Sequence, residues 1–360
     1  MRKQDAFVYT GLPARVVFGY GTIQYVAREA DALGMQRALV LTTETSRHKG
    51  EDVSDRLGKL SAGVYSGAKM HTPVEGTDAA MEHFKSIGAD GIVAIGGGST
   101  IGLGKAIALR TDCPQLVIPT TYAGSEMTPN LGQTENGIKT VTSSPKILPE
   151  TVIYEVELTH SLAPKISAAS GMNAIAHAAE ALYAKDTNPI VRLMAIEGIS
   201  SLRSALPKIV SDPNDRQARF TALYGAWLCS ALLAQASVAL HHQICHAIGG
   251  AFNTSHADTH ANILPYAIAY NSRIPGTAMD DLAAALGAEQ AAQGLYLLNE
   301  DLGIRSSLKD LGVPADGVDT IVEQIVAKPY WNPRAINRGA LQNTLKGAWH
   351  GDPPEYEADA

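Results

Sequence analysis

Four of the chain's eleven histidines fall in one short stretch, HHQICHAIGGAFNTSH (241–256). His242 and His246 are four residues apart, so they share one face if the segment is helical. The pair Gly249-Gly250 can end that helix and turn the chain so that His256 returns to the same place. Imidazole binds metal ions and titrates near neutral pH. The stretch therefore predicts either a metal site or a set of groups that hydrogen-bond a substrate and transfer protons.

A second pair with the same spacing lies upstream in SGMNAIAHA, where Asn173 and His177 are four residues apart. An amide offers a neutral oxygen, whereas a carboxylate would add negative charge and hard lone pairs. Three neutral imidazoles can still hold Zn²⁺, so a metal ion stays open at this point. The missing carboxylate nevertheless favours a site in which histidines act directly on a substrate.

Two glycine- and hydroxyl-rich turns could hold a phosphate-bearing cofactor. AIGGGSTIGLGK (94–105) places three glycines between an apolar strand and a helix, where backbone N–H groups and the helix dipole favour an anion. IPTTYAGSE (118–126) follows the next apolar strand, and ligands of open α/β sheets gather at that edge. Neither turn is a GxGxxG or Walker motif. The predicted cofactor-binding residues here are Gly96, Gly97, Gly98, Ser99, Thr120, Thr121 and Ser125.

The elements that must position these residues fall into two groups. Short β-rich runs at 37–43, 63–68, 91–98, 115–121 and 151–159, with a helix over 74–88, predict βαβ units and a parallel sheet. Ala- and Leu-rich periodic segments follow at 168–184, 191–210 and 217–249. We therefore predict an α/β domain over 1–160, an all-helical domain over 161–350 and a disordered acidic tail over 351–360.

Composition excludes several classes of protein. The net charge is −7 and no basic tract is present, so nucleic acid is not an expected partner. The most apolar stretch, 226–240, is too short and too polar for a membrane span, and no secretory signal precedes the first strand. Three scattered cysteines suit a reducing compartment, so we expect a cytoplasmic protein.

Taken together, these segments resemble the iron-containing (group III) alcohol dehydrogenase family. The resemblance is carried by FGYG (18–21), GGGST (96–100), IPTTYAGSE (118–126), SGMNAIAHAAEALYA (170–184) and HQICHAIGGAFNTSHA (242–257). It implies an N-terminal dinucleotide-binding domain, a C-terminal helical domain and a homodimer. It also implies that Lys139 lies near the nicotinamide ribose, and that Tyr330 belongs to a C-terminal segment that could contact substrate.

The chain departs from the metal-dependent members of that family at two places. Gly102 and Asn173 each stand where those members carry Asp, while His177, His242 and His256 match their other metal-ligand positions. The chain is most similar to the branch that reduces the carbon–carbon double bond of the dicarboxylate maleylacetate to give 3-oxoadipate, in the breakdown of aromatic compounds. A carboxylate in the pocket would repel this dianion, which favours a site with no required metal. The resemblance implies NADH or NADPH as the cofactor.

The resulting assignment gives each side chain a role. His246 and His256 are the predicted catalytic residues, as proton donor or oxyanion stabiliser. Asn173, His177, His242 and Tyr330 are predicted to line the substrate site, and His241 and His260 to be peripheral.

Other functions stay open on the sequence. One is a metal-dependent alcohol or polyol dehydrogenase. Another is a lyase resembling dehydroquinate synthase, which regenerates bound NAD. A third is a cofactor-binding scaffold that has lost its chemistry.

Overall fold

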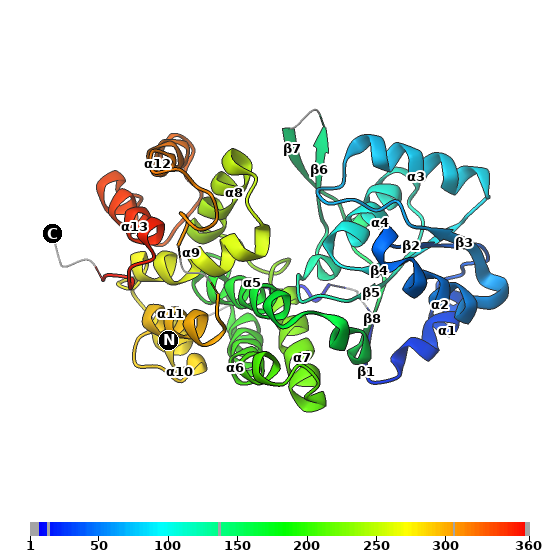
Figure 1. The fold of residues 1–360 in the computed structure, drawn as a ribbon, viewed down its shortest axis with the longest axis horizontal. Coiled ribbons are helices and arrows are strands. Elements are labelled where there is room, and N and C mark those ends of the chain that lie inside the picture. The colour runs from blue at the N-terminus through cyan, green and yellow to red at the C-terminus, as the bar shows by residue number, and fades with distance from the viewer. Residues whose placement is uncertain (1–6, 13–14, 136–137, 305–306, 357–360) are drawn as a thin grey trace. The chain divides into compact units, whose positions relative to one another are not determined.

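The computed structural model describes residues 7–12, 15–135, 138–304 and 307–356. The chain divides into two compact units, one over Leu12–Leu162 and one formed by the residues after it together with 7–11. The sequence-based division had placed 7–11 in the first domain. Figure 1 labels the elements of both units.

The first unit is built on a six-stranded parallel sheet with the order β1-β8-β5-β4-β2-β3. All five predicted strands are present, although each is shorter than its apolar run. Two features were not predicted from the sequence, the edge strand β1 and the antiparallel hairpin β6–β7. The polar residues of the hairpin give no apolar signal. The strands are β1 (Arg15–Gly19), β2 (Ala38–Leu41), β3 (Ser61–Tyr65), β4 (Gly91–Gly96), β5 (Gln115–Pro119), β6 (Asn130–Glu135), β7 (Ile138–Ser143) and β8 (Thr151–Glu155).

Helices cover both faces of this sheet (Figure 1). On β4, Val93 and Ile95 pack with residues of α1 and α2, while Ile92 and Ala94 pack with residues of α3 and α4. This alternation is the period-2 pattern of a strand that is buried on both sides. The helices are α1 (Val26–Ala32), α2 (Arg47–Leu57), α3 (Val74–Ser86) and α4 (Gly98–Thr111).

The second unit is helical, as predicted. Its central helix α5 is Ala-rich and buried continuously from Ser167 to Tyr183, because small side chains let neighbouring helices pack on every side. The helices are α5 (Pro164–Tyr183), α6 (Pro189–Ser211), α7 (Arg216–Leu232), α8 (Leu240–Phe252), α9 (His256–Tyr270), α10 (Ala278–Leu286), α11 (Ala291–Asp301), α12 (Gly317–Ala327) and α13 (Arg338–His350).

The predicted helical segment 217–249 is interrupted between α7 and α8. Ser237 breaks the helical pattern, since its N–H and hydroxyl donate to the Asp186 carboxylate at 2.8 and 2.6 Å. The end of α8 also differs from expectation. The helix continues through both glycines to Phe252 and ends at Asn253, which takes the left-handed conformation that asparagine tolerates. His256 consequently starts α9 and does not lie in a loop.

The tail is ordered over the part that the structure describes. The carbonyl oxygens of Gly351 and Asp352 accept hydrogen bonds from Tyr296 and Tyr266 at 3.0 and 2.8 Å. Tyr356 Oη accepts from the backbone N–H of Gln293 at 3.3 Å. These contacts explain why 351–356 is not disordered as predicted, and residues 357–360 lie outside the described part.

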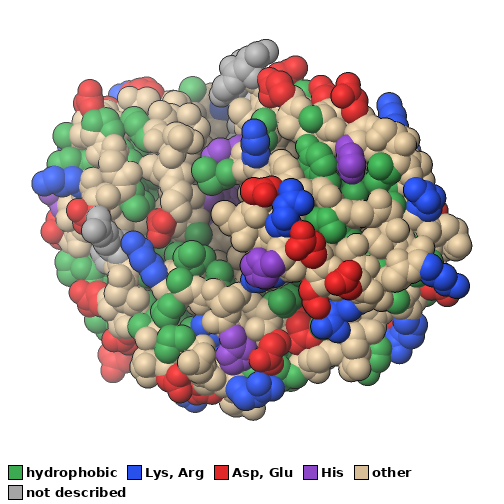
Figure 2. All heavy atoms as spheres, turned by 45° about the vertical axis from the view of Figure 1, so that its right-hand side comes forward, with side chains coloured by type: hydrophobic (Ala, Val, Ile, Leu, Met, Phe, Trp, Pro, Cys, Tyr) green, Lys and Arg blue, Asp and Glu red, His purple; other side chains and the backbone are tan. Residues whose placement is uncertain are grey.

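Two observations bear on partners. In the described ranges, every helix is too short or too polar to cross a membrane. On the face drawn in Figure 2, Lys and Arg side chains alternate with Asp and Glu side chains over the described residues.

Candidate active site

In the α/β unit, the connections leave the sheet in opposite directions at the neighbouring strands β2 and β4. These strands are neighbours in the sheet, yet the helix after β2 packs on one face and the helix after β4 packs on the other. In open parallel sheets, ligands bind outside the carboxyl ends of the strands at such a switch in direction. The glycine turn that follows β4 lies at this point.

The glycine turn has the geometry its sequence suggested. Gly96 ends β4 with a φ of 155°, and a Cβ there would lie 2.4 Å from Thr100 Oγ1. Gly97 precedes α4, and a Cβ there would lie 3.1 Å from Thr121 Cγ2. Gly98 is exposed, and α4 begins without a side-chain cap. The first turn of α4 therefore presents backbone N–H groups in the manner of anion-binding helix ends.

The second turn is tied to the first by its backbone. The N–H of Thr120 donates to the Gly96 carbonyl at 3.1 Å, and the contact at Gly97 adds Thr121. Ser125 lies farther along the same turn and is half-buried. The structure thus brings six of the seven predicted cofactor residues of these turns to one edge of the sheet, and the seventh, Ser125, follows in the second turn.

Lys105 anchors the second turn, and sequence reasoning gave it no role. Its buried Nζ donates to the carbonyls of Ser125, Thr128 and Asn130, the last two at 2.8 and 2.9 Å. Burial lowers the pKa of Lys105 to about 7, and the Glu126 carboxylate opposes that shift. The spacing that could have revealed Lys105 is GGGST followed five residues later by a lysine on the buried face of the helix.

Lys139 lies in the β6–β7 hairpin, where its backbone pairs with Thr134. Its side chain is outside the described part of the structure, so its predicted place near a ribose stays a prediction.

The loop after β2 carries both charges that could meet an adenosine ribose. Exposed Arg47 donates to the Glu44 carboxylate at 3.1 Å and to Ser66 Oγ at 2.7 Å. Hydrogen bonds from Arg47 and Ser66 lower the pKa of Glu44, which is exposed at the surface.

In the helical unit, the histidines predicted from spacing do lie together. Asn173 and His177 are buried on α5, and His242 is buried on α8. The rings of His177 and His242 stack with centroids 5.4 Å apart, and His246 lies 6.1 Å from His242. His246 is exposed, and its Nδ1 lies 3.4 Å from the hydroxyl of Tyr330. One histidine of each i,i+4 pair, His177 on α5 and His242 on α8, therefore meets the other across the two helices.

Glu180 holds this cluster in place through hydrogen bonds, and the sequence analysis did not predict this role. Its carboxylate is 1% exposed and accepts the backbone N–H groups of Ala239 and His241, each at 2.8 Å. It also lies 2.6 Å from His242 Nδ1. An ionised carboxylate can only accept there, so Nδ1 of His242 is the donor, and in that tautomer Nε2 is the acceptor. Glu180 thus caps α8 and fixes a histidine tautomer.

His260 lies inside the cluster, which corrects its predicted peripheral position. Its ring centroid lies 4.2 Å from His256 and 5.0 Å from His242. It lies 4.9 Å from His241, whose Nε2 is 3.1 Å from His260 Nδ1. Burial lowers the pKa of His177, His241 and His260 well below the ordinary imidazole value, so all three are neutral at pH 7. Because α9 starts at His256, a position one helical turn later faces the same way.

We tested whether these residues fit the metal ion that the family resemblance implies. Buried nitrogens of His177 (Nδ1) and His242 (Nε2) have no hydrogen-bond partner among the described residues, so each could face a cation. His256, the third histidine at a family metal-ligand position, is exposed. The fourth such position is Asn173, which carries a neutral amide. In the described part of the chain, one group of three His, Cys, Asp or Glu donor atoms lies within 4.8 Å, and it contains none of these four positions. The donor set at these positions lacks a carboxylate, so it is incomplete relative to that of the metal-dependent members.

Comparisons with known proteins cover nearly the whole chain. A family profile described as "Iron-containing alcohol dehydrogenase" matches residues 13–156, and one described as "Fe-containing alcohol dehydrogenase family, C-terminal" matches 167–349. The chain therefore belongs to the iron-containing alcohol dehydrogenase family.

Several relatives of high identity to this chain are named maleylacetate reductase. The chain is 52% identical to maleylacetate reductase of Rhizobium sp. (strain MTP-10005) and 49% identical to that of Burkholderia cepacia, covering 97% of this chain and 99% of each relative. The crystal structure of maleylacetate reductase from Agrobacterium tumefaciens matches with a TM-score of 0.94 at 52% identity, covering 97% of this chain and 99% of that one.

The buried neutral histidines make stability depend on pH. In the unfolded chain they titrate near pH 6.5, whereas in the folded chain the pKa values of His241 and His260 are lower. Below about pH 6.5 the unfolded state binds more protons than the folded state. The free energy of unfolding therefore decreases as the pH is lowered, by up to about 1.4 kcal/mol per pH unit for each such group. Urea unfolding from pH 7.5 to 5 should show this slope, and His241→Gln should reduce it. An equal slope in the variant would show that His241 is not a buried neutral group.

Proposed function

We propose that this protein catalyses the NAD(P)H-dependent reduction of the carbon–carbon double bond of maleylacetate, giving 3-oxoadipate. The observation that carries the proposal is the agreement of relatives 49–52% identical over 97% of the chain, each named maleylacetate reductase. The neutral donor set of the helical unit supports it, because an amide at 173 and imidazoles at 177 and 242 suit a dianionic substrate.

The cofactor is NADH or NADPH, held by the two turns of the α/β unit. Bound nicotinamide supplies a hydride to the substrate. The pyrophosphate is placed at the N-terminus of α4, where Gly97 and Gly98 leave room for it. At the ribose, Glu44 can accept from the 2′-hydroxyl of NADH, while Arg47 can pair with the 2′-phosphate of NADPH. This loop therefore suits both cofactors.

The neutral site lowers the cost of binding two carboxylates. At about 4 Å and an effective dielectric constant near 20, a carboxylate at position 173 would cost roughly 4 kcal/mol of repulsion. Asn173 removes that charge and can still donate from its amide. Glu180 also lies beside His242, but its carboxylate is engaged in hydrogen bonds with that ring and with two backbone N–H groups.

The chemistry requires a donor for a developing negative charge. Hydride adds to the alkene carbon β to the ketone, the alkene π electrons form a double bond between the α-carbon and the carbonyl carbon, and the carbonyl π electrons move onto the oxygen to give an enolate. A proton then adds to the α-carbon. A hydrogen-bond donor to such an oxyanion in a dry site is worth about 3–4 kcal/mol. We assign this donor and the proton transfer to His246 and His256, the exposed members of the cluster, with Tyr330 beside His246.

We propose that this reaction needs no metal ion. Support comes from the incomplete donor set at the family's ligand positions. The second candidate is a metal-dependent alcohol dehydrogenase, favoured by one contact: Glu180 fixes the His242 tautomer whose Nε2 lone pair could bind a cation. We further propose that the protein works as a homodimer in the cytoplasm, in the degradation of aromatic compounds.

Removing metal should separate these two functions. Protein dialysed against EDTA should retain full maleylacetate reduction and contain far less than one iron or zinc per chain. Asn173→Asp should raise affinity for divalent ions and raise KM for maleylacetate, because the carboxylate restores an anionic ligand and repels the dianion. Activity that EDTA abolishes and Fe²⁺ or Zn²⁺ restores would establish the metal-dependent function.

Substituting the glycine turn should weaken cofactor binding. Gly97→Val would place a branched side chain against Thr121, where a Cβ already lies 3.1 Å away, and would push the backbone off the pyrophosphate. We expect Kd for NADH, measured by fluorescence titration, to rise at least tenfold. Gly76→Ala, on α3, is the matched control, since its added Cβ meets nothing within 4 Å and its φ is not positive. An unchanged Kd for Gly97→Val would remove the turn from the cofactor site.

Removing either catalytic histidine should affect the chemical step. His246→Ala and His256→Ala should each lower kcat roughly 100-fold while Kd for NADH stays near the wild-type value. A residue that only holds a carboxylate would instead raise KM. Steady-state kinetics with maleylacetate distinguish the two, and His350→Ala, on α13, is the control. Wild-type kcat in both variants would contradict the histidine mechanism and direct attention to Lys139 or Tyr330.

A further inference from the structure

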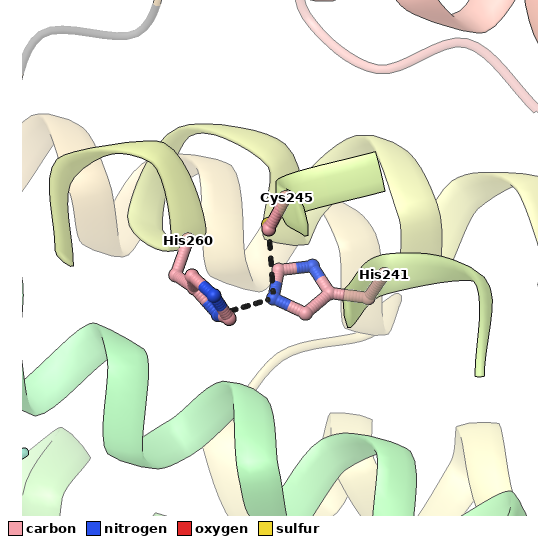
Figure 3. A group of neighbouring side chains, drawn as sticks. All are labelled: His241, Cys245 and His260. Atoms are coloured by element: carbon pink, nitrogen blue, oxygen red, sulfur yellow. Dashed lines mark hydrogen bonds between the residues drawn. The ribbon is translucent and has the colours of Figure 1, made fainter. Parts of the chain in front are cut away.

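A second cluster of metal-binding side chains lies beside the family's ligand positions. His241 and Cys245 are four residues apart on α8, and His260 faces them from α9 (Figure 3). His241 Nε2 lies 3.1 Å from His260 Nδ1 and 3.7 Å from Cys245 Sγ. The three donor atoms lie within 4.8 Å of one another. None of the three is Asn173, His177, His242 or His256.

The spacing of these atoms matches a single metal ion. Zn²⁺ binds nitrogen at about 2.0–2.1 Å and sulfur at about 2.3 Å. At tetrahedral angles, two bound nitrogens would then lie about 3.3 Å apart, and a bound nitrogen and sulfur about 3.6 Å apart. The observed separations of 3.1 and 3.7 Å are close to these values, and the donor atoms of His260 and Cys245 lie within 4.8 Å of each other.

The surroundings select a soft ion of low charge. His241 and His260 are 0% exposed and Cys245 is 3% exposed. A neutral imidazole keeps one nitrogen lone pair for a metal, and the Cys245 sulfur becomes a thiolate ligand when its proton leaves on binding. A thiolate with two imidazoles suits Cu⁺ and Zn²⁺. With Cu⁺ the thiolate gives a neutral buried site, whereas Zn²⁺ would leave an uncompensated positive charge, which is costly in an apolar interior.

We propose that His241, Cys245 and His260 form a binding site for one Cu⁺ ion. Binding replaces the S–H bond with an S–Cu bond and releases one proton per ion. The ring that donates in the His241–His260 hydrogen bond moves its proton to its other nitrogen, so both ligand nitrogens bind through lone pairs. The site is independent of the proposed reduction.

The test is anaerobic competition for Cu⁺ against a colorimetric Cu⁺ chelator, with reduced protein and long equilibration because the site is buried. Wild-type protein should retain about one Cu⁺ per chain and show a Cu–thiolate absorption band. Cys245→Ser should lower the affinity at least 100-fold and abolish the band. Cys229→Ser is the matched control, because it removes another fully buried cysteine, on α7, and should bind as wild type does.

Further measurements keep the proposal open to contradiction. If Cys245→Ser fails to fold, judged by circular dichroism, His260→Gln replaces it and should also bind at least 100-fold more weakly. Equal binding by wild type and a folded Cys245→Ser or His260→Gln would overturn the site. Tighter binding of Zn²⁺ than of Cu⁺ would overturn the assignment of the ion. Because no substrate is used, failure of the proposed reduction would leave these results unchanged.

Discussion

Glu180 places a negative charge inside an apolar helical unit, and the histidine cluster depends on how that charge is satisfied. An isolated buried carboxylate would be prohibitively costly. Here two backbone N–H groups of α8, the ring of His242 and the hydroxyl of Tyr183 surround it. The same contacts start α8 after the break at Ser237 and turn His242 toward α5. One carboxylate therefore sets both the backbone and the ring that follows it.

Lys105 has the corresponding role in the α/β unit. Its buried ammonium group is surrounded by carbonyl and hydroxyl oxygens from the segment 125–130. That segment joins the second hydroxyl-rich turn to the β6–β7 hairpin. In each unit, a buried ionisable side chain is thus held by backbone groups, an arrangement that orients the neighbouring loops.

The neutrality of the proposed substrate site follows from a single difference in residue type. Asn173 keeps the shape and position of an aspartate but not its charge. Around it, His177, His241 and His260 are held neutral by burial, while His246 and His256 stay exposed. Buried imidazoles shape the site, and exposed ones can exchange protons with water. This division of roles suits the metal-free reduction of a dianion that we propose.

The sequence alone determined the features that are encoded locally. Apolar periodicity predicted a parallel sheet followed by helices, the glycine turn predicted a strand-to-helix junction, and i,i+4 spacing predicted paired side chains on α5 and α8. Tertiary structure decided what depends on residues far apart in the chain. Glu180 lies sixty-two residues before His242, and Asp186 fifty-one before Ser237, so neither contact has a local signal.

His260 shows the same limit within one segment, because its place depends on where α9 begins. Helix α8 ends at Asn253 and α9 begins after Ser255, whereas the sequence predicted that α8 ends at the glycine pair. With His256 in a loop, His260 had no fixed direction, and with His256 at the start of a helix it must face the cluster. The sequence determined which chemical groups were available, and packing between distant helices decided which of them meet, because burial and orientation are properties of the assembled core.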